Sequence, residues 1–290
     1  RYIDGYSSAG PFFLKVSFAR PHSPYDPPQR WWDFFTKRPL PRPQVSGWAA
    51  KYAERNSARD DIWHGRVSEQ ESLYARVGYY GSVAFVDEQI GRIIESLEKR
   101  KILDETLIVY ISDHGDMTGD HNLWRKSYAY EPSARIPMIV RGPGAGRGRV
   151  EMTPSEIRDV LPTFVEAAGG TVPSEVEGQS LLHLKREWID LEHDVCYDAS
   201  NHWNALTDGR SKYIYHAQSG EEQFFDLASD PMEMKDLAGS SPETAKWRAR
   251  MVAHLEPRGD QWVRDGRLVA RPKSQLYSPN YPKAPSPAKQ

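Results

Sequence analysis

Residues 106–112 read Thr-Leu-Ile-Val-Tyr-Ile-Ser and end directly before Asp113-His114-Gly115. The run is short, apolar and rich in β-branched side chains, which favours a strand buried on both faces. Ligands of open α/β sheets bind outside the carboxyl ends of strands. The polar turn that follows this strand is therefore the first candidate for a functional site.

The segments on either side of this strand predict the rest of an α/β domain. Apolar residues between Ser72 and Lys101 recur every three or four positions, which is typical of one long amphipathic helix. Residues 12–18 and 136–140 are further strand-like runs, and residues 159–168 predict a helix that stops at two glycines. The order strand, helix, strand indicates an α/β fold with a mixed, mostly parallel sheet sandwiched by helices.

The chain changes in character after about residue 190. Residues 212–216 and 223–227 predict a β-hairpin, and Asp230-Pro231 predicts the start of a helix. We therefore expect an α/β domain over residues 1–190 and a smaller subdomain of antiparallel strands and a helix over residues 191–270. Residues 271–290 are rich in proline and predict an extended tail.

The composition argues against several classes of protein. The chain has 290 residues, with 38 Lys and Arg against 40 Asp and Glu, so no basic excess indicates a nucleic-acid partner. No apolar run approaches the roughly 18 residues of a membrane span, so we expect no membrane partner. The single cysteine, Cys196, excludes an internal disulfide and a multi-cysteine metal cluster.

Side chains suited to binding ions gather between residues 112 and 126. Asp113 is an oxygen donor and His114 a nitrogen donor, so together they could supply part of the coordination of a divalent cation. Lys126 is a compact positive charge that suits an oxyanion. The same pattern also fits an Asx-turn with a solvated histidine. For His22, a loop position held between prolines is as good an explanation as a functional role.

Several motifs occur together and in a fixed order. They are Arg-Pro-His-x-Pro at 20–24, Ser-Asp-His-Gly-Asp-Met-x-Gly-Asp-His at 112–121, Leu-Trp-x-Lys at 123–126, Tyr-Glu-x-Ser-x-Arg-Ile-Pro at 130–137 and Phe-Asp-Leu-x-x-Asp-Pro-x-Glu at 225–233. This ordered set resembles the sulfatase family of the alkaline-phosphatase superfamily over nearly the whole chain. The resemblance implies an alkaline-phosphatase-like fold and hydrolysis of a sulfate ester of a carbohydrate or an aryl group.

The resemblance also implies roles for individual residues. Asp113 and His114 correspond to metal ligands, with Ca²⁺ as the usual ion. Lys126 corresponds to the lysine that contacts the sulfate, and His22 to the histidine on the leaving-group side; both are predicted to be catalytic. His121 lies between these motifs and is a weaker candidate for substrate contact. His202, beside Trp203 in the smaller subdomain, is a second candidate for contact with a sugar substrate, although packing is the commoner use of such an aromatic residue.

One half of such a site is missing from the sequence. The resemblance implies a formylglycine nucleophile made within a Cys/Ser-x-Pro-x-Arg motif, together with an upstream Asp-Asp metal pair. Cys196 has no such context, and Asp60-Asp61 follows the His22 loop and fits a solvated surface pair better.

We therefore expect the chain to be the carboxyl-terminal portion of a sulfatase that needs an amino-terminal partner segment. By itself it should be inactive and expose an unpaired sheet edge. The family resemblance also favours an exported protein. Two alternatives remain open: a phosphodiesterase or phosphonate monoester hydrolase of the same superfamily, and a non-catalytic protein that binds an anion or a glycan.

Overall fold

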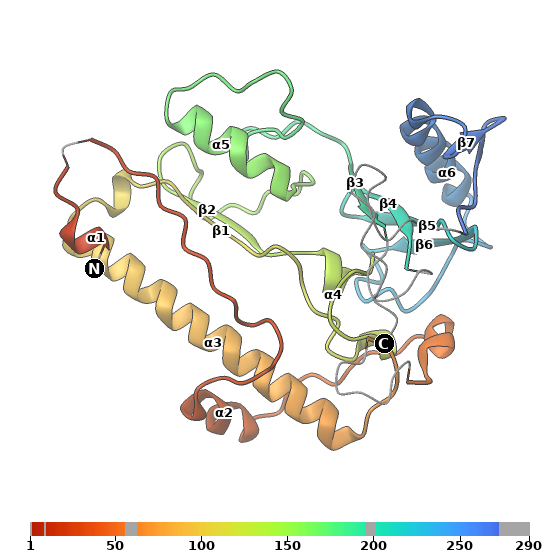
Figure 1. The fold of residues 1–290 in the computed structure, drawn as a ribbon, viewed down its shortest axis with the longest axis horizontal. Helices are drawn as coiled ribbons and strands as arrows, with labels where there is room; N and C mark the ends of the chain where they lie inside the picture. The colour runs from red at the N-terminus through yellow and green to blue at the C-terminus, as the bar shows by residue number, and fades with distance from the viewer. Residues whose placement is uncertain (1, 9, 56–62, 195–200, 273–290) are drawn as a thin grey trace, which may run out of the picture. The chain divides into compact units, whose positions relative to one another are not determined.

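The computed structural model describes residues 2–8, 10–55, 63–194 and 201–272. It consists of two compact units (Figure 1). The first unit comprises residues 1–126, 135–151 and 155–185, and the second comprises residues 127–134, 152–154 and 186–290. The main division after residue 185 lies near the boundary predicted at 190. The segment 127–134 belongs to the second unit, although the sequence assigns it to the α/β domain.

The longest element of the first unit is helix α3 (Glu69–Lys99), drawn in orange and yellow in Figure 1. Ser68 caps its start: the Ser68 hydroxyl accepts a hydrogen bond from the Glu71 amide at 3.1 Å, and the Glu71 carboxylate accepts one from the Ser68 amide at 2.7 Å. The helix confirms the amphipathic pattern predicted over residues 72–101. No helix in the described part of the chain is long and apolar enough to cross a membrane.

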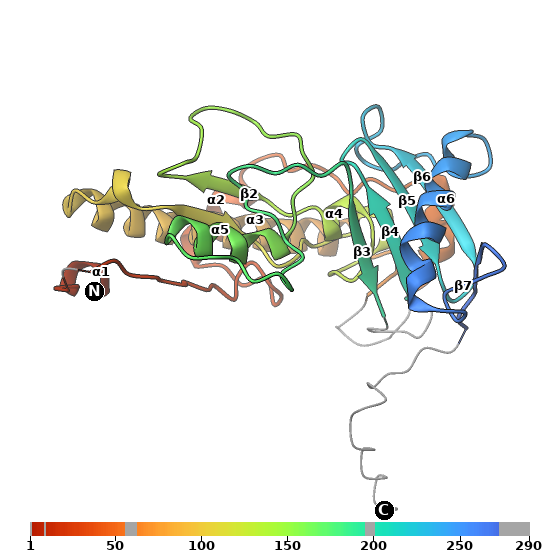
Figure 2. The ribbon, with the colours of Figure 1, turned by 90° about the horizontal axis from the view of Figure 1, so that it is seen from above.

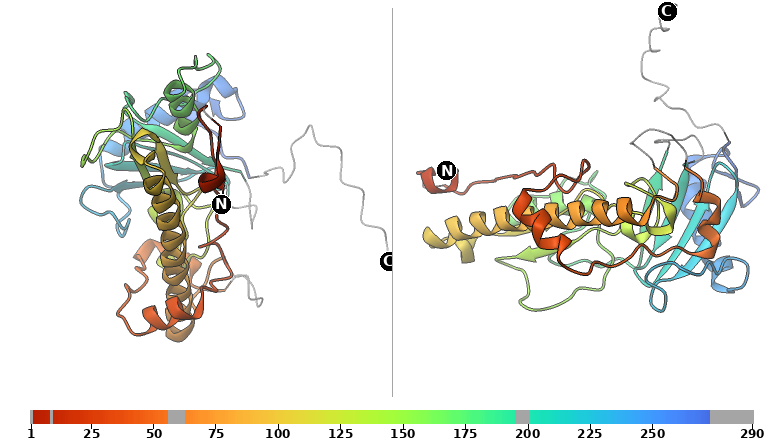
Figure 3. Two further views of the ribbon diagram at one scale, coloured as in Figure 1. Left: turned by 90° about the vertical axis from the view of Figure 1, so that its left-hand side faces the viewer. Right: turned by 90° about the horizontal axis from the view of Figure 1, so that it is seen from below.

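Helix α2 (Gln29–Thr36) packs along α3, as Figure 3 shows. The Trp32 ring lies 5.5 Å from the Tyr74 ring, and the Phe35 ring lies 5.9 Å from the Tyr80 ring, measured between centroids. These contacts place aromatic residues of α2 against one face of α3. They hold the loop that precedes α2, which carries His22, close to the long helix.

The strands predicted at 106–112 and 136–140 are present as β1 (Ile108–Ile111) and β2 (Met138–Arg141). Helix α5 (Val160–Ala167) confirms the helix predicted over 159–168. The mostly parallel pairing is not found, because every strand pair in the described residues is antiparallel. The chain reverses direction between β1 and β2, so the two neighbours run in opposite directions. Both strands are only half-buried, because a two-stranded sheet covers little of its own surface.

The strand predicted over residues 12–18 is wrong for the described structure. This segment forms none of the described ladders, and Phe13 is 70% exposed. Leu14, Val16 and Phe18 are exposed as well. The apolar composition was read correctly, but a strand also needs a neighbour to pair with, which a local pattern cannot supply. The first unit also contains short helical turns: α1 (Tyr2–Gly5), η1 (Gly47–Tyr52), η2 (Leu103–Glu105), η3 (Asp120–Asn122) and η4 (Ile157–Asp159).

The second unit is built on a four-stranded antiparallel sheet with the strand order β3-β4-β5-β6 (Figure 2). Its strands are β3 (Ile189–His193), β4 (Trp203–Thr207), β5 (Ser211–His216) and β6 (Glu221–Asp226). Helix α6 (Glu243–Leu255) covers one face, where Leu206, Tyr213 and Phe224 pack with Trp247 and Met251 in one core. The predicted hairpin and antiparallel subdomain are confirmed. The remaining elements are α4 (Glu131–Ala134), η5 (Glu256–Arg258), β7 (Val263–Arg264) and β8 (Arg267–Leu268).

The helix predicted at Asp230-Pro231 is wrong. Residues 230–233 form a turn, in which the Asp230 carboxylate accepts a hydrogen bond from the Lys235 amide at 2.8 Å. Glu233 then adopts a left-handed conformation with φ of 54°, which a continuing helix does not allow. Asp60, Asp61, Cys196 and the tail beyond residue 272 lie outside the described residues.

Candidate anion-binding site

The loop that carries His22 is held against helix α3. The His22 amide donates to the Ala19 carbonyl at 3.1 Å, and the backbone of Tyr25 passes directly over Gly78 of α3. A Cβ atom at Gly78 would lie 2.3 Å from the Tyr25 carbonyl oxygen, so only glycine permits this approach. The sequence of α3 thus fixes the position of the His22 loop.

The second component of the site is the turn directly after β1. The His114 amide donates to the Asp113 carboxylate at 3.0 Å, and the Ser112 hydroxyl donates to the His114 carbonyl. The Nε2 atom of His114 lies 3.7 Å from the other carboxylate oxygen of Asp113. Asp113 is therefore part of a local turn and also presents its carboxylate, which is 87% exposed, beside an imidazole. The Asx-turn and the ion-binding interpretation are both compatible with this geometry.

The third component is Lys126, whose Nζ atom lies 2.7 Å from Nε2 of His22. The rings of His22 and His114 lie 6.1 Å apart, measured between centroids. Three segments distant in sequence thus converge, and they bring together His22, Lys126, His114 and, beside it, Asp113. This is the arrangement that the predicted roles require.

The hydrogen bonds fix the proton positions on both imidazoles. Nδ1 of His22 lies 2.7 Å from the Ser23 carbonyl, and Nδ1 of His114 lies 2.7 Å from the Gly115 carbonyl. A carbonyl oxygen only accepts, so each Nδ1 carries the proton. In a neutral imidazole, Nε2 then has a free lone pair. The Nε2 lone pair of His22 faces the Lys126 ammonium group, and the Nε2 atom of His114 lies near the Asp113 carboxylate.

Asp116 holds these segments together and was not singled out from the sequence. Its carboxylate accepts hydrogen bonds from the Tyr25 hydroxyl at 2.8 Å, the Thr118 amide at 3.0 Å and the Arg125 amide at 3.2 Å. It therefore joins the His22 loop to Thr118, two residues further along, and to Arg125, the residue before Lys126. Burial and the neighbouring Asp116 charge raise the pKa of Tyr25 above its ordinary value, so Tyr25 remains a donor. The sequence offered one signal for Asp116, which is its place in the Asp-His-Gly-Asp run at residues 113–116.

The two predicted substrate-binding histidines are both buried, His121 in the first unit and His202 in the second. His121 is 0% exposed, its Nδ1 atom lies 3.4 Å from the Ser46 amide, and its ring centroid lies 4.6 Å from that of Trp48. It is packed in the interior of the first unit. His202 belongs to the second unit, where its Nε2 atom lies 3.3 Å from an Arg271 guanidinium nitrogen. Burial, followed by the Arg271 charge, lowers the pKa of His202. Substrate contact by either residue remains a prediction.

The Asp113 carboxylate fits part of a calcium shell, because Ca²⁺ binds oxygen ligands at about 2.3–2.6 Å. The Nε2 atom of His114 lies 3.7 Å from this carboxylate and is a nitrogen donor, which fits Ca²⁺ less well than an oxygen does. The His114 tautomer leaves Nε2 available to a cation that accepts nitrogen ligands. However, the described residues contain no group of three or more His, Cys, Asp or Glu side chains that could hold a metal ion. These two residues therefore fit a cation that receives most of its ligands from elsewhere.

Comparison with known proteins first defines the class of protein. The structure superposes on the crystal structure of a phosphonate monoester hydrolase from Agrobacterium radiobacter with a TM-score of 0.69 and 25% identity, covering 91% of this chain and 61% of that one. The fold is alkaline-phosphatase-like. A family model described as "Sulfatase" matches residues 1–170, and one described as "N-sulphoglucosamine sulphohydrolase, C-terminal" matches residues 119–261. The chain therefore belongs to the sulfatase family of the alkaline-phosphatase superfamily.

Two relatives show how much of the family's length is present. An arylsulfatase from Clostridium perfringens is 37% identical over 274 residues, which cover 89% of this chain and 56% of the relative. A choline-sulfatase from Rhizobium meliloti is 32% identical over 269 residues, which cover 88% of this chain and 51% of the relative. The chain thus spans about half the length of these relatives.

Proposed function

We propose that this chain contributes the Lys126 side of a sulfatase active site, which hydrolyses a sulfate ester of a carbohydrate or an aryl group. The observation that carries the proposal is the 2.7 Å contact between Lys126 and His22, next to His114. A lysine ammonium and an imidazole at one point provide donors for the oxygens of a transferring sulfuryl group. The relatives named arylsulfatase and choline-sulfatase support this choice of ester.

The proposed site is completed by a segment that corresponds to the amino-terminal part of the relatives. A formylglycine on that segment would supply the nucleophile, since this sequence contains no Cys/Ser-x-Pro-x-Arg motif. Supporting observations are the chain's coverage of 56% of the arylsulfatase and the exposed apolar side chains Phe13, Val16 and Phe18. Such a surface suits an additional strand, because exposed apolar residues on unpaired extended backbone favour pairing with another chain segment.

Each residue of the described cluster then has a defined task. Lys126 binds a sulfuryl oxygen, and His22 acts on the side of the leaving oxygen. Asp113 and His114 contribute to a calcium site, and the ion would stabilise negative charge on the sulfate as a Lewis acid. Asp116 orients the backbone that carries Lys126.

Sulfate release from 4-nitrophenyl sulfate by the complete protein, including the proposed amino-terminal segment, tests the proposal. Removal of one donor to a developing oxyanion costs about 10²–10³-fold in rate, and we expect a loss of this size for Lys126→Ala. Lys37→Ala changes an exposed lysine at the end of α2 and should leave the rate unchanged. If Lys126→Ala is as active as the Lys37 control, the assignment of the site is wrong.

The calcium assignment has a separate test that does not depend on turnover. Titration of the complete protein with Ca²⁺ in a calorimeter should give a binding isotherm, and Asp113→Ala should weaken the affinity at least about tenfold. Asp26→Ala serves as the control, because Asp26 is a surface carboxylate that pairs with Arg20. An unchanged affinity in Asp113→Ala would remove Asp113 from the cation site.

A second candidate function is phosphonate monoester hydrolysis, which is favoured by the structural match to the Agrobacterium radiobacter enzyme. Parallel assays with 4-nitrophenyl sulfate and 4-nitrophenyl phenylphosphonate distinguish the two esters. Binding of sulfate that depends on Lys126, without turnover of either ester, would instead identify a non-catalytic anion-binding protein.

A further inference from the structure

The segment that follows Lys126 is fixed by the sheet of the second unit. The Ser127 carbonyl accepts hydrogen bonds from the Asn201 side-chain amide at 2.9 Å and from the Trp203 indole N–H at 3.0 Å. Three residues further on, the Tyr130 hydroxyl donates to the Gln223 side chain on β6 at 2.7 Å. Ser127 is joined to Lys126 by a peptide bond, so these contacts act one residue from the proposed sulfate-binding lysine.

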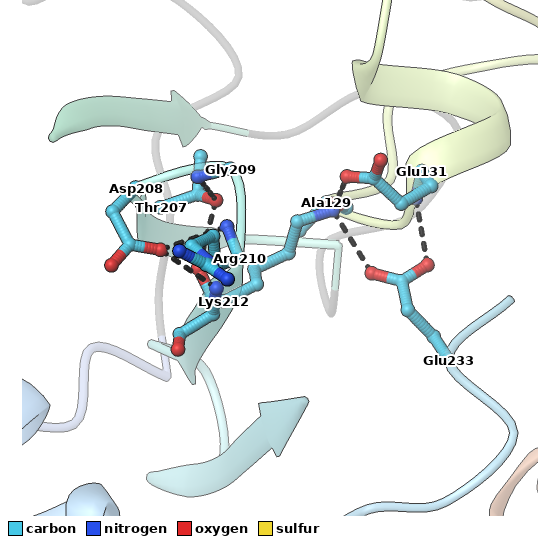
Figure 4. Close-up of polar contacts among 9 residues, drawn as sticks. Ala129, Glu131, Thr207, Asp208, Gly209, Arg210, Lys212 and Glu233 are labelled. Carbon is cyan, nitrogen blue, oxygen red and sulfur yellow. Dashed lines mark hydrogen bonds and ion pairs between the residues drawn. The ribbon is translucent and has the colours of Figure 1, made fainter. Parts of the chain in front are cut away.

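A further anchor of this segment is Lys212 of β5, whose polar contacts are drawn in Figure 4. Its side chain is 1% exposed. Its ammonium group donates to the Ala129 carbonyl at 2.7 Å and lies 2.7 Å from a Glu131 carboxylate oxygen and 2.9 Å from a Glu233 carboxylate oxygen. The second Glu233 oxygen accepts a hydrogen bond from the Glu131 amide at 2.7 Å. All three N–H donors of the lysine thus have acceptors, and two of these acceptors belong to the segment 127–134.

This arrangement is costly if stability is its only purpose. Burial alone would lower the pKa of Lys212, but attraction by Glu233 and Glu131 outweighs this effect and raises the pKa, so the lysine remains charged. Replacement of a buried ion network by apolar residues of similar size is often neutral or stabilising. Apolar packing does not orient backbone groups, because it makes no directional hydrogen bonds. Lys212 does orient them, since it binds the Ala129 carbonyl and the Glu131 side chain of the segment 127–134.

We propose that Lys212 is a positioning residue for the anion site. Through Ala129 and Glu131 it fixes the backbone that begins at Ser127, and thereby the placement of Lys126 for its contact with His22. Lys212 then affects the affinity of the site for a sulfate group through the peptide bond that joins Lys126 to Ser127. This inference rests on the proposed function, because it assumes that Lys126 binds the anion.

Two buried tyrosines provide a matched pair of variants. Tyr130 and Tyr213 are 1% and 0% exposed, and each donates its hydroxyl hydrogen to a β6 side chain, at 2.7 Å to Gln223 and at 2.6 Å to Glu222. Only Tyr130 lies in the segment after Lys126. Tyr130→Phe and Tyr213→Phe each remove one hydroxyl hydrogen bond from a buried ring, and only the first loosens the proposed support.

The measurement is the dissociation constant of inorganic sulfate for the complete protein, together with the melting temperature of each variant. We expect Tyr130→Phe and Trp203→Phe to weaken sulfate binding about three- to tenfold, and Lys212→Met to weaken it further. Tyr213→Phe should lower the melting temperature at least as much as Tyr130→Phe, because its bond is to a carboxylate, and it should leave the sulfate affinity unchanged. With 4-nitrophenyl sulfate as the substrate, the KM values of these variants should rise in the same order as their dissociation constants for sulfate.

The outcomes separate the two proposals. If Lys126→Ala weakens sulfate binding but Tyr130→Phe and Trp203→Phe behave like Tyr213→Phe, the positioning role is overturned and the proposed site stands. If Lys126→Ala leaves sulfate binding unchanged, or the unaltered protein does not bind sulfate, the proposed function fails and the positioning role fails with it. Should Lys212→Met not fold, the Tyr130 and Trp203 variants still decide the matter.

Discussion

Asp116 provides the most direct test of how the site is assembled. Asp116→Ala removes one acceptor that serves the Tyr25 hydroxyl, the Thr118 amide and the Arg125 amide. A hydrogen bond to a charged group contributes about 1.5 kcal/mol or more, and neighbouring losses add incompletely. We therefore expect the free energy of unfolding of the first unit to fall by about 3–4 kcal/mol. Tyr25→Phe removes one of the three bonds and should cost about 1.5 kcal/mol.

Urea denaturation followed by tryptophan fluorescence measures both losses, with ΔG extrapolated to zero denaturant. Asp26→Ala is the control, because its surface ion pair with Arg20 should change stability by less than about 1 kcal/mol. The ratio between the variants is as informative as the size of either loss. Equal losses for Asp116→Ala and Tyr25→Phe would mean that the two backbone amides do not depend on Asp116. A loss for Asp116→Ala no larger than that of the control would refute the role of Asp116 altogether.

Three further predictions concern single interactions. Arg76→Met should destabilise the first unit by about 3 kcal/mol in urea denaturation, because it leaves Asp120 buried without its cation at 3.0 Å; a change below about 1 kcal/mol would contradict this. The hydrogen bond from Arg248 lowers the pKa of Glu222, so this pair stabilises the folded state above about pH 4.5 and loses that contribution as the pH falls through the lowered pKa. In Arg248→Met, the unfolding free energy should therefore fall less between pH 7 and pH 3 than it does in the unaltered protein. An unchanged pH dependence would speak against the pair. Nitrogen NMR spectra should show the Nδ1–H form of neutral His22, and the Nε2–H form would be inconsistent with the Ser23 contact.

The sequence was most informative where local pattern decides structure. The period of apolar residues located α3, a run of β-branched residues located β1, and two glycines marked the end of α5. The turn between two short strands located the β5–β6 hairpin. It was misleading where a long-range contact determines the local structure. Residues 12–18 have a strand-like composition but no neighbour among the described strands. At Asp230 the side chain caps a turn instead of a helix, because Glu233 bends back to bind Lys212 and the Glu131 amide. The sequence pattern of residues 230–233 does not indicate that long-range contact.

The same distinction applies to the candidate site. His22, Lys126, Asp113 and His114 were recognised by chemistry and motif, and the fold brings their segments together. Asp116 was missed because its partners are two backbone amides and a tyrosine 91 positions away. Support of this kind depends on geometry, which residue types at a given spacing do not specify. For the same reason, the anchoring of Ser127 by Trp203 was not predictable from either segment alone.

The proton arrangement around His22 restricts how the site can assist a leaving group. The imidazole holds its proton on Nδ1 against the Ser23 carbonyl and accepts from Lys126 on Nε2, so at rest the proton closest to the reacting side belongs to the lysine. In the proposed site, His22 can therefore protonate a departing alkoxide only after its Nε2 atom has gained a proton. Nitrophenolate leaves readily without a proton, whereas an alkyl alkoxide does not. His22→Ala should accordingly slow hydrolysis of an alkyl sulfate about 10²-fold or more and that of 4-nitrophenyl sulfate much less, while Lys126→Ala slows both. Equal losses on the two esters in His22→Ala would show that His22 binds the sulfuryl group instead of protonating the leaving oxygen.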